Sequence, residues 1–353
     1  MSTKKQYVRV RREQGEETRQ LLVASKLLDL DYKIVKEQGF LYFPLLSEVD
    51  RPSVDEALNG HEFKAGFREF QPTQVGPRTL EEALKDKMPS EKLELLPRAY
   101  DLIGDIAVLE IPEELEVYVT EIGLAFQRIH RNFSTVLAKQ GAISGLTRTR
   151  EYAVLAGENK TKTIHTEYGV RIAVDLAVAY FSPRLLEEHN RVAEQVQSRE
   201  SVLDMFTGVG PFALHIAKKR VSHVVAVDIN ANAIKLLKES MDLNPLVGTI
   251  EPVVSDAHEY VRELSPAAMD RVIMNHPSGA SDFIADACHV LKPGGIIHYY
   301  DFLGGEDPEG QLRKKTVELV KAAGREIEQI PMIRRVRDSA PYEHQMVADL
   351  IIS

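Results

Sequence analysis

The sequence contains one cysteine in 353 residues and has no long apolar run. Cys288 alone can form neither an intrachain disulfide nor a zinc site built from cysteines, and its place in the run FIADACHVL predicts a buried, unreactive thiol. No window approaches the roughly 20 consecutive apolar residues of a membrane span, and the charged start MSTKKQYVRVRREQ lacks the apolar stretch of a signal peptide. We therefore expect a cytoplasmic, monomeric protein with no membrane partner and no implied protein partner.

Acidic side chains outnumber basic ones, 53 against 44, and the net charge of −9 taken alone argues against a nucleic-acid partner. The charges are segregated, however. Residues 1–20 carry six basic and three acidic side chains, and residues 128–171 and 313–337 each carry eight and three, whereas residues 81–121 carry four and twelve. The three basic segments are either ordinary solvated surface or parts of a surface that binds a polyanion.

The length predicts two or three domains, at roughly 100 to 200 residues each. A polar stretch containing proline and glycine at residues 70–79 is typical of a linker, and it closes a small α/β domain with a basic strand over residues 1–70. A change of pattern near residue 185 separates a middle α/β domain, residues 71–184, from a third domain, residues 185–353. In the middle domain we expect the apolar segment at 100–112, YDLIGDIAVLEIP, to form one strand.

From about residue 185, strand and helix signals alternate strictly. The predicted strands VLDMF, HVVAVDI, PVVSDA, RVIMN and IIHYYDF are continuous apolar runs separated by helical segments, which indicates a parallel sheet covered on both faces. Two more strands, REIEQIPMIRRVR and QMVADLIIS, follow without a helix between them, so we expect one antiparallel strand at the edge. This is the α/β arrangement of the Rossmann-like, class I S-adenosylmethionine-dependent methyltransferase fold.

The first strand and turn of this domain, LDMFTGVGPF, carry Gly208 and Gly210, which let the backbone turn sharply and approach a ligand. The next strand ends at Asp228, where a carboxylate can accept hydrogen bonds from both ribose hydroxyls, and a third ends at Asp256, placed to meet an adenine edge. An NAD site would place a further glycine at position 213. The looser form of that fingerprint allows Ala213, so the glycines alone do not exclude NAD.

The pattern Asp-x-Phe-x-Gly-x-Gly-x-Phe favours S-adenosylmethionine, because Asp204 is available for the amino group of a methionine moiety. The fourth strand ends in Asn275-His276-Pro277, which resembles the Asn-x-Pro element that amino-group and ring-nitrogen methyltransferases place beside the sulfonium. A single Asn-Pro neighbourhood also fits an ordinary turn. The predicted cofactor-binding residues are Asp204, Phe206, Gly208, Gly210, Asp228, Ile229, Asp256 and Asn275.

Over nearly its whole length the chain resembles one family, the archaeal and eukaryotic tRNA (guanine-N1)-methyltransferases that modify position 37. The resemblance lies in VRVRREQGEETRQLL, YDLIGDIAVLEIP, RTREYAVLAGENKTKTIHTEYG, AYFSPRLLEEHNRV and the methyltransferase domain. RTREY…LAGE and the FSPR junction are the most specific parts, because neither belongs to the general methyltransferase fold. The resemblance implies a tRNA partner, tRNA docking by residues 1–70 and an RNA-binding middle domain.

Guanine N1 carries a proton at neutral pH, so its methylation needs a base for that proton and a donor that stabilises charge on O6. A carboxylate is a suitable base because burial can raise its pKa. The resemblance assigns the base to Glu188 in RLLEEH, the O6 contact to Arg148 in RTREY, and fixation of the target base to Asn275. The predicted substrate-binding residues are Tyr180, Arg184 and Pro277.

Each assignment has a structural alternative. Glu187 and Glu188 would also suit a helix start, where acids interact favourably with the macrodipole, and Arg148 would suit a phosphate contact. The chain departs from the family at His276, where leucine or proline is usual, and at His189, where an arginine commonly follows the acid. The histidines singled out in the sequence show no metal-ligand spacing, so we expect no metal site.

Other classes of methyltransferase fit less well. A 5-methylcytosine enzyme needs a cysteine nucleophile, and Cys288 lies in the middle of a predicted helix. An enzyme acting on adenine or guanine amino groups would normally have an aromatic residue where Ser278 follows Pro277. A small-molecule methyltransferase would not explain the extra α/β segments. Another tRNA or rRNA base, a tricyclic guanosine derivative at the same position, and a non-catalytic RNA-binding relative stay open as alternatives.

Overall fold

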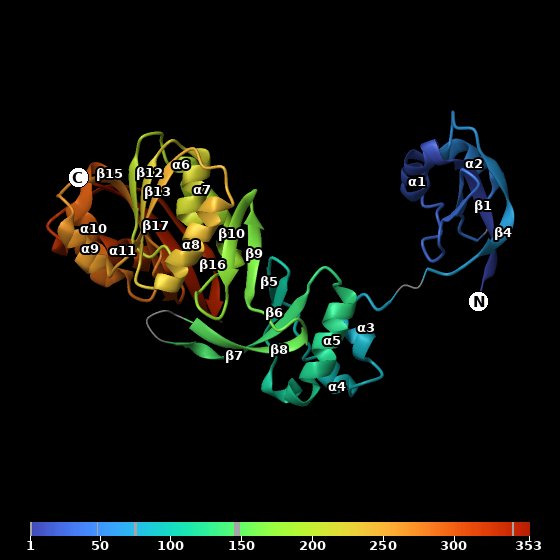
Figure 1. Ribbon diagram of the computed structural model, residues 1–353, viewed down its shortest axis with the longest axis horizontal. Helices are drawn as coiled ribbons and strands as arrows, with labels where there is room; N and C mark the ends of the chain where they lie inside the picture. The colour runs from blue at the N-terminus through green and yellow to red at the C-terminus, as the bar shows by residue number, and fades with distance from the viewer. Residues whose placement is uncertain (1, 48, 74–75, 145–148, 341) are drawn as a thin grey trace. The chain divides into compact units, whose positions relative to one another are not determined.

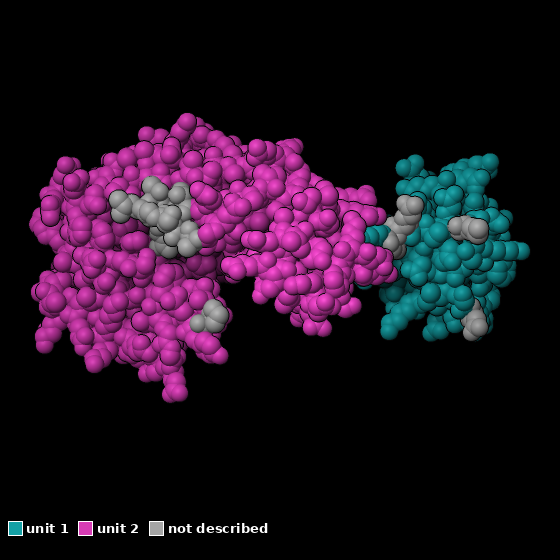
Figure 2. Space-filling model, turned by 90° about the horizontal axis from the view of Figure 1, so that it is seen from below, with its two compact units in different colours: residues 1–83 teal, residues 84–353 magenta. Residues whose placement is uncertain are grey.

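The chain forms two compact units, residues 1–83 and 84–353, which Figure 2 shows in different colours. The computed structural model describes all residues except 1, 48, 74–75, 145–148 and 341. Within the second unit, one apolar cluster joins residues on both sides of position 184, among them Leu137 and Val224. The domain boundaries expected at 70 and 184 stay predictions. None of the helices in the described part of the chain has the length and apolar character that crossing a membrane requires.

The first unit is a four-stranded sheet in the order β2-β3-β1-β4 with two helices. Along the central strand β1, Val8 and Val10 are buried whereas Arg9 and Arg11 are not, because successive side chains of a strand point to opposite faces. The elements are β1 (Thr3–Arg11), η1 (Arg12–Gln14), α1 (Gly15–Ala24), β2 (Val35–Glu37), β3 (Phe40–Pro44), α2 (Arg51–Ala57) and β4 (Lys64–Phe70).

The second unit begins with a mixed sheet in the order β5-β6-β7-β8, against which α5 packs. The single strand expected at 100–112 is wrong: the segment is an antiparallel hairpin of β5 and β6. Gly104 reverses the chain with a φ of +55°, which glycine adopts without strain. The boundary between the units falls within α3 (Leu80–Leu84). The elements that follow it are α4 (Ser90–Leu93), β5 (Tyr100–Ile103), β6 (Ile106–Leu109), η2 (Glu113–Tyr118), α5 (Val119–Ile129), β7 (Thr135–Ser144) and β8 (Thr149–Gly157).

A separate hairpin of β9 (Lys162–Glu167) and β10 (Val170–Asp175) follows. Its side chains Val170 and Ile172 are fully buried in the cluster that includes the next sheet, and the backbone N–H of Ala173 donates to Ser240 Oγ at 2.8 Å. The hairpin therefore packs on helices α7 and α8 of the next sheet, and Glu167, at the end of β9, lies beside α6 and α7.

The largest sheet has seven strands in the order β13-β12-β11-β14-β15-β17-β16, and the first five are parallel. Helices α6, α7 and α8 cover one face and α9, α10 and α11 the other, each with its own apolar cluster (Figure 1). The elements are η3 (Pro183–Leu185), α6 (Leu186–Gln195), β11 (Ser201–Asp204), α7 (Pro211–Lys219), β12 (His223–Asp228), α8 (Ala231–Asp242), β13 (Thr249–Val254), α9 (Ala257–Glu263), β14 (Met269–Met274), η4 (Ala280–Phe283), α10 (Ile284–Val290), β15 (Leu291–Gly304), α11 (Pro308–Ala322), β16 (Ile327–Ala340) and β17 (Glu343–Ile352).

The strand that runs against the others is β17, and it lies inside the sheet rather than at the edge where we expected it. It pairs antiparallel with β15 on one side and with β16 on the other. The reason is visible in the residues. The run QMVADL of β17 is buried throughout, whereas β16 is half-buried or exposed along its length and contains Pro331, which has no N–H to donate.

Candidate active site

A cavity opens where neighbouring parallel strands end, at the carboxyl edge of the seven-stranded sheet. The segments that follow β11, β12, β13 and β14 all line it, because the carboxyl ends of parallel strands meet at one edge. Eight of the predicted site residues line this cavity: Tyr180, Phe206, Gly208, Asp228, Ile229, Asp256, Asn275 and Pro277.

The turn after β11 depends on two glycines with positive φ, +55° at Gly208 and +80° at Gly210. Gly208 lines the cavity, and its backbone N–H donates to Asp228 Oδ2 at 2.7 Å. Gly210 does not line the cavity. A side chain at Gly210 would clash with Leu237 of α8, so this glycine lets the turn pack closely on the neighbouring helix.

The ends of β12 and β13 suit an adenosine. Asp228 accepts from two backbone N–H groups, those of Gly208 and of Asn230 at 2.8 Å, and burial raises the pKa of its carboxyl. Each carboxylate oxygen keeps a lone pair that can accept from a ribose hydroxyl. Ile229, 47% exposed, offers an apolar surface beside it, and Asp256 caps the start of α9. This set of donors and acceptors fits the nucleoside part of S-adenosylmethionine.

Asp204 is not at the cavity. It is fully buried, its Oδ2 accepts from the Thr207 hydroxyl at 2.7 Å, and its Oδ1 has no partner in the described part of the chain. Burial, together with the nearby charge of Asp228, raises the pKa of Asp204 to about 7. The structure therefore places Asp204 behind the glycine turn, where it holds the loop, and not where it could reach a methionine amino group.

The C-terminal strands add two polar residues to the cavity that the sequence did not reveal. Gln345 of β17 donates to Asn275 Oδ1 at 3.0 Å, and Arg337 of β16 donates to Gln345 Oε1 at 2.7 Å. The same guanidinium donates to the Tyr180 hydroxyl at 3.1 Å and to Ser182 Oγ at 3.3 Å. All five residues line the cavity. Arg337 lies in a basic segment of the sequence, but no local signal marks Gln345.

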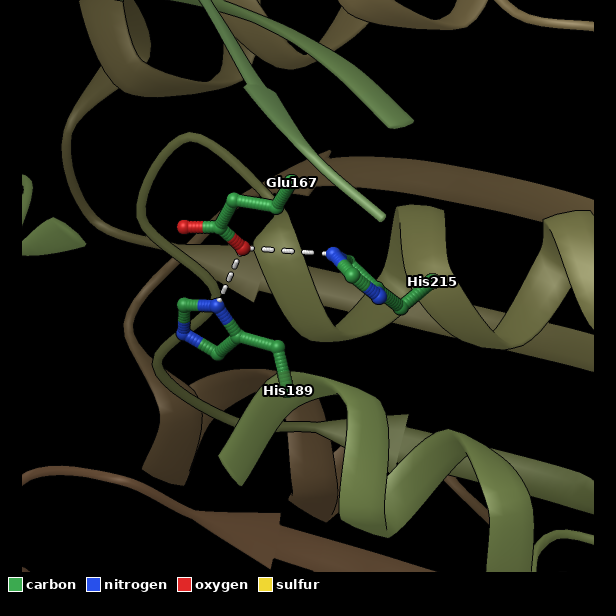
Figure 3. A group of neighbouring side chains, drawn as sticks. All are labelled: Glu167, His189 and His215. Atoms are coloured by element: carbon green, nitrogen blue, oxygen red, sulfur yellow. Dashed lines mark hydrogen bonds and ion pairs between the residues drawn. The ribbon is translucent and has the colours of Figure 1, made fainter. Parts of the chain in front are cut away.

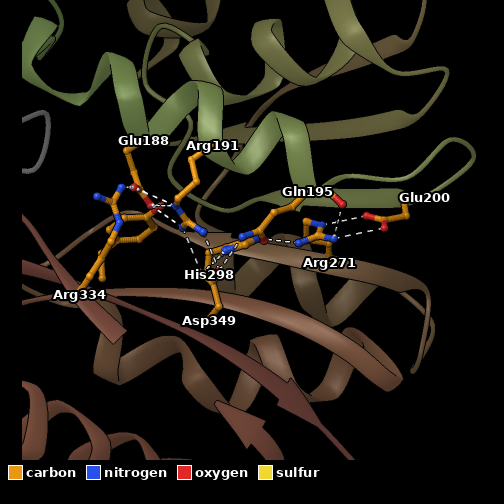
Figure 4. A network of polar contacts seen from close by, with 9 residues as sticks. Glu188, Arg191, Gln195, Glu200, Arg271, His298, Arg334 and Asp349 are labelled. Atoms are coloured by element: carbon orange, nitrogen blue, oxygen red, sulfur yellow. Dashed lines mark hydrogen bonds and ion pairs between the residues drawn. The ribbon is translucent and has the colours of Figure 1, made fainter. Parts of the chain in front are cut away.

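Glu188 is buried and does not line the cavity. Its carboxylate accepts from the Tyr300 hydroxyl at 2.7 Å, from Arg191 Nε at 3.0 Å and from Arg334 (Figure 4). Burial alone would raise the pKa of Glu188, but the hydrogen bonds and charge of Arg191 and its other partners lower it. In this structure Glu188 is therefore an ionised group held between two guanidinium groups.

The network continues through the sheet below α6. Arg191 donates to Asp349 at 2.6 Å, and Asp349 also contacts His298 Nδ1 at 2.6 Å. Arg271 lies against His298 Nε2 at 2.7 Å and pairs with Glu200 at 2.8 Å (Figure 4). Because Arg271 can only donate, His298 Nε2 is the acceptor and Nδ1 carries the proton toward Asp349. These alternating positive and negative groups thus hold α6, the helix that contains Glu188, against the sheet.

Two predicted site residues remain, Arg184 and Arg148. Arg184 pairs with Asp101 of β5 at 2.7 Å and does not line the cavity. Arg148 lies outside the described residues. Cys288 is buried as expected, and burial raises the pKa of its thiol to about 11, which suits an inert residue.

One group of side chains in the described part of the chain has the composition of a metal site: Glu167, His189 and His215, whose possible ligand atoms lie within 4.8 Å of one another. The sequence did not predict this group, because its members come from β9, α6 and α7. The same atoms are already joined by hydrogen bonds, at 2.8 Å for His189 Nδ1 and 3.2 Å for His215 Nε2, both to Glu167 Oε2.

Comparison with known proteins places the chain in a family. Models of the tRNA methyltransferase 5 N-terminal domain, the TYW2 N-terminal domain and the TRM5/TYW2 methyltransferase domain match residues 8–54, 80–161 and 163–331. The tRNA (guanine(37)-N(1))-methyltransferase Trm5b of Pyrococcus abyssi is 39% identical over 346 residues, which are 98% of each chain.

Two further relatives bear on the activity. A solved complex of aTrm5 with tRNALeu has a TM-score of 0.74 and 34% identity, covering 98% of this chain and 99% of that one. The tRNA(Phe) (4-demethylwyosine(37)-C(7)) aminocarboxypropyltransferase of Pyrococcus horikoshii is 30% identical over 280 residues, 78% of this chain and 96% of its own.

These similarities confirm the fold, the cofactor and the family that the sequence predicted, and the NAD alternative is wrong. The chain contains an S-adenosylmethionine-dependent methyltransferase domain. The assignment of its cofactor to the cavity lined by Asp228 and the glycine turn stays a prediction. The chain belongs to the family of tRNA (guanine(37)-N(1))-methyltransferases.

Proposed function

We propose that the chain transfers the methyl group of S-adenosylmethionine to N1 of guanosine 37 in tRNA. One observation carries the proposal: Asn275, held by Gln345, and Asp228, the acid proposed to bind the ribose, line the same cavity. A base held by Asn275 would therefore lie beside the cofactor. The near full-length similarity to Trm5b and the likeness to the aTrm5 complex with tRNALeu support tRNA as the partner.

The bound cofactor supplies an electrophilic methyl group, and the protein must hold guanine and take its N1 proton. Because Asn275 Oδ1 accepts from Gln345, its amide N–H groups are left to donate to an oxygen of the base. Arg148, by its place in RTREY, would stabilise charge developing on O6. Pro277 and Tyr180 line the cavity beside Asn275 and would confine the base.

Glu188 is the proposed general base, and it needs one contact to change before it can act. Arg334 covers its carboxylate, and the Arg334 side chain is 39% exposed, whereas that of Arg191 is 18% exposed. A tRNA phosphate competing for Arg334 would remove one cation from Glu188. The carboxylate would then be a stronger base and would be open on the side that Arg334 occupies.

The decisive experiment uses two labelled cofactors and an unmodified tRNA carrying guanosine 37. With the label on the methyl group, we expect label in 1-methylguanosine at position 37. With the label on the carboxyl carbon of the methionine moiety, we expect none in the tRNA. A matched tRNA with adenosine at position 37 should remain unlabelled. Label at another nucleoside would contradict the proposed substrate.

Aminocarboxypropyl transfer is the second candidate, because the Pyrococcus horikoshii aminocarboxypropyltransferase matches this chain along 96% of its own length. In that reaction the bond that breaks joins the sulfur to the methionine side chain rather than to the methyl group. On a tRNA that carries 4-demethylwyosine at position 37, the base in that relative's name, the carboxyl label would then enter the tRNA and the methyl label would not. The two labels, each tested on both tRNAs, therefore separate the candidates.

A further inference from the structure

Glu167 is a buried carboxylate surrounded by histidines (Figure 3). Its Oε2 accepts hydrogen bonds from His189 and His215, and its Oε1 lies 3.7 Å from His165 Nε2. In the described part of the chain, no lysine or arginine pairs with Glu167. Burial alone would raise the pKa of Glu167, but the hydrogen bonds from His189 and His215 lower it to about 2. Glu167 is therefore ionised at neutral pH.

An ionised carboxylate can only accept hydrogen bonds, so each ring nitrogen bonded to Glu167 carries the proton. For His189 this nitrogen is Nδ1, at 2.8 Å from Glu167 Oε2. In the neutral ring, Nε2 is then an acceptor with a free lone pair. No described residue makes a hydrogen bond to His189 Nε2. The carboxylate thus fixes both the orientation of the His189 ring and the nitrogen that is left to bind a ligand.

His189 alone among the three histidines around Glu167 lines the cofactor cavity. It lies on α6 near Leu185, and its ring meets Phe212, in the first turn of α7, edge-on with ring centres 4.7 Å apart. Pro211, the first residue of α7, also lines the cavity. His189 therefore borders the cavity at the helix that follows the glycine turn.

The amino-acid end of the cofactor is expected to bind at this border of the cavity. With the nucleoside held by Asp228 and Asp256 at the ends of β12 and β13, the methionine moiety would extend across the glycine turn toward α7. The N-terminus of α7 favours its carboxylate, because the first N–H groups of a helix lack partners within the helix. Its ammonium group needs an acceptor, and Asp204 is buried behind the turn.

We propose that His189 binds the amino-acid end of S-adenosylmethionine, with Nε2 accepting a hydrogen bond from the α-ammonium group, and that Glu167 is the positioning residue that sets this tautomer. The proposal concerns cofactor binding and stands whether or not Glu188 is the base. It also gives a use to a buried carboxylate that the transfer chemistry does not otherwise employ.

The test compares S-adenosylhomocysteine with 5′-methylthioadenosine by titration calorimetry, because the second ligand keeps the nucleoside thioether and lacks the amino-acid end. The variant is His189→Asn, whose amide can donate to Glu167 from the position of Nδ1 but ends short of the cavity. We expect the variant to bind S-adenosylhomocysteine at least about tenfold more weakly. Its affinity for 5′-methylthioadenosine should stay within about twofold of the unchanged protein, as no amino-acid contact is lost.

His215→Gln is the matched control, because His215 bonds to the same carboxylate but does not line the cavity. It should leave the affinity for both ligands unchanged. Equal weakening of the two ligands by His189→Asn, no weakening of either, or the same selective loss in His215→Gln would each overturn the proposal.

Two measurements on the unchanged protein remain informative if a variant does not fold. Nitrogen-15 spectra of the imidazole rings should show His189 with its proton on Nδ1, and a proton on Nε2 would overturn the proposal. Metal analysis of the purified protein should find no stoichiometric metal. A zinc ion held by Glu167, His189 and His215 would overturn it too, since Nδ1 would then be a ligand rather than a donor.

Discussion

Gln345 of β17 donates to Asn275 Oδ1 at 3.0 Å, past β15, which lies between β17 and β14 in the sheet. Gln345 is 1% exposed, and its Oε1 accepts a hydrogen bond from Arg337. An asparagine amide has an acceptor end and a donor end, so this one bond decides which end faces the cavity. The orientation of the residue proposed to hold the target base thus depends on a strand 70 positions away in the sequence.

Gln345→Glu should therefore slow methyl transfer without weakening the binding of the cofactor. An ionised glutamate accepts but does not donate, so Asn275 would turn its N–H groups toward it and present an oxygen to the base. We expect the single-turnover rate to fall about tenfold, the scale of a lost hydrogen bond, with S-adenosylhomocysteine affinity within about twofold. An unchanged rate would show that Gln345 does not orient Asn275.

Glu188→Gln tests the proposed base. The substitution keeps the size of the side chain but removes its basicity, so the single-turnover rate should fall about 10²-fold or more, with little change in binding. Because the pKa of Glu188 is lowered, the rate of the unchanged protein should decline only at acidic pH, and this decline should vanish in the variant. Glu187→Gln is the control, since Glu187 is exposed and bonds to Tyr168. Equal effects of the two substitutions would refute the assignment.

Asp228→Ala should weaken the binding of S-adenosylmethionine by about 1.5 to 3 kcal/mol, because the substitution removes a charged acceptor for the ribose hydroxyls. It also removes the acceptor for the Gly208 N–H, so thermal unfolding of the ligand-free variant should be measured alongside the titration. Unchanged affinity in a folded variant would mean that the ribose does not bind at the end of β12.

Asp204→Asn should stabilise the protein at neutral and alkaline pH. The folded-state pKa of Asp204 is raised from 3.8 to about 7, so its favourable contribution is complete below pH 3.8 and is lost as the pH rises toward 7. Asparagine keeps the acceptor for Thr207 and carries no charge. The unfolding temperatures of the two proteins should therefore agree near pH 3.5 and diverge in favour of the variant by pH 8. A variant less stable than the unchanged protein at pH 8 would contradict this.

Removal of residues 1–83 should weaken tRNA binding and leave cofactor binding unchanged. This unit has its own apolar core and a basic first strand, and the residues lining the cavity all belong to the second unit. We expect KM for tRNA to rise and the salt dependence of tRNA binding to become less steep. S-Adenosylhomocysteine affinity should not change, and its loss in a folded truncation would be incompatible with this role.

The position of Gly208 and Asp228 at the cavity was predictable because their signals are local. Gly208 comes shortly after one apolar run and Asp228 ends another, both runs are typical of buried parallel strands, and the ends of such strands share one edge. The family resemblance likewise rests on short segments such as FSPR and RTREY. For the same reason the hairpin at 100–112 was missed: a four-residue strand on each side of Gly104 differs little in composition from one longer strand.

By itself the sequence determined the alternation of strands and helices, the glycine turn and the acids at the strand ends, since each depends on neighbours along the chain. Only the tertiary structure decided that β17 enters the sheet beside β15, which brings Gln345 to Asn275 and Asp349 to Arg191. It likewise decided that Glu167 meets His189. These contacts join segments 22 to 158 positions apart, and strand order and helix packing, which create them, are settled by burial over the whole domain rather than by local pattern.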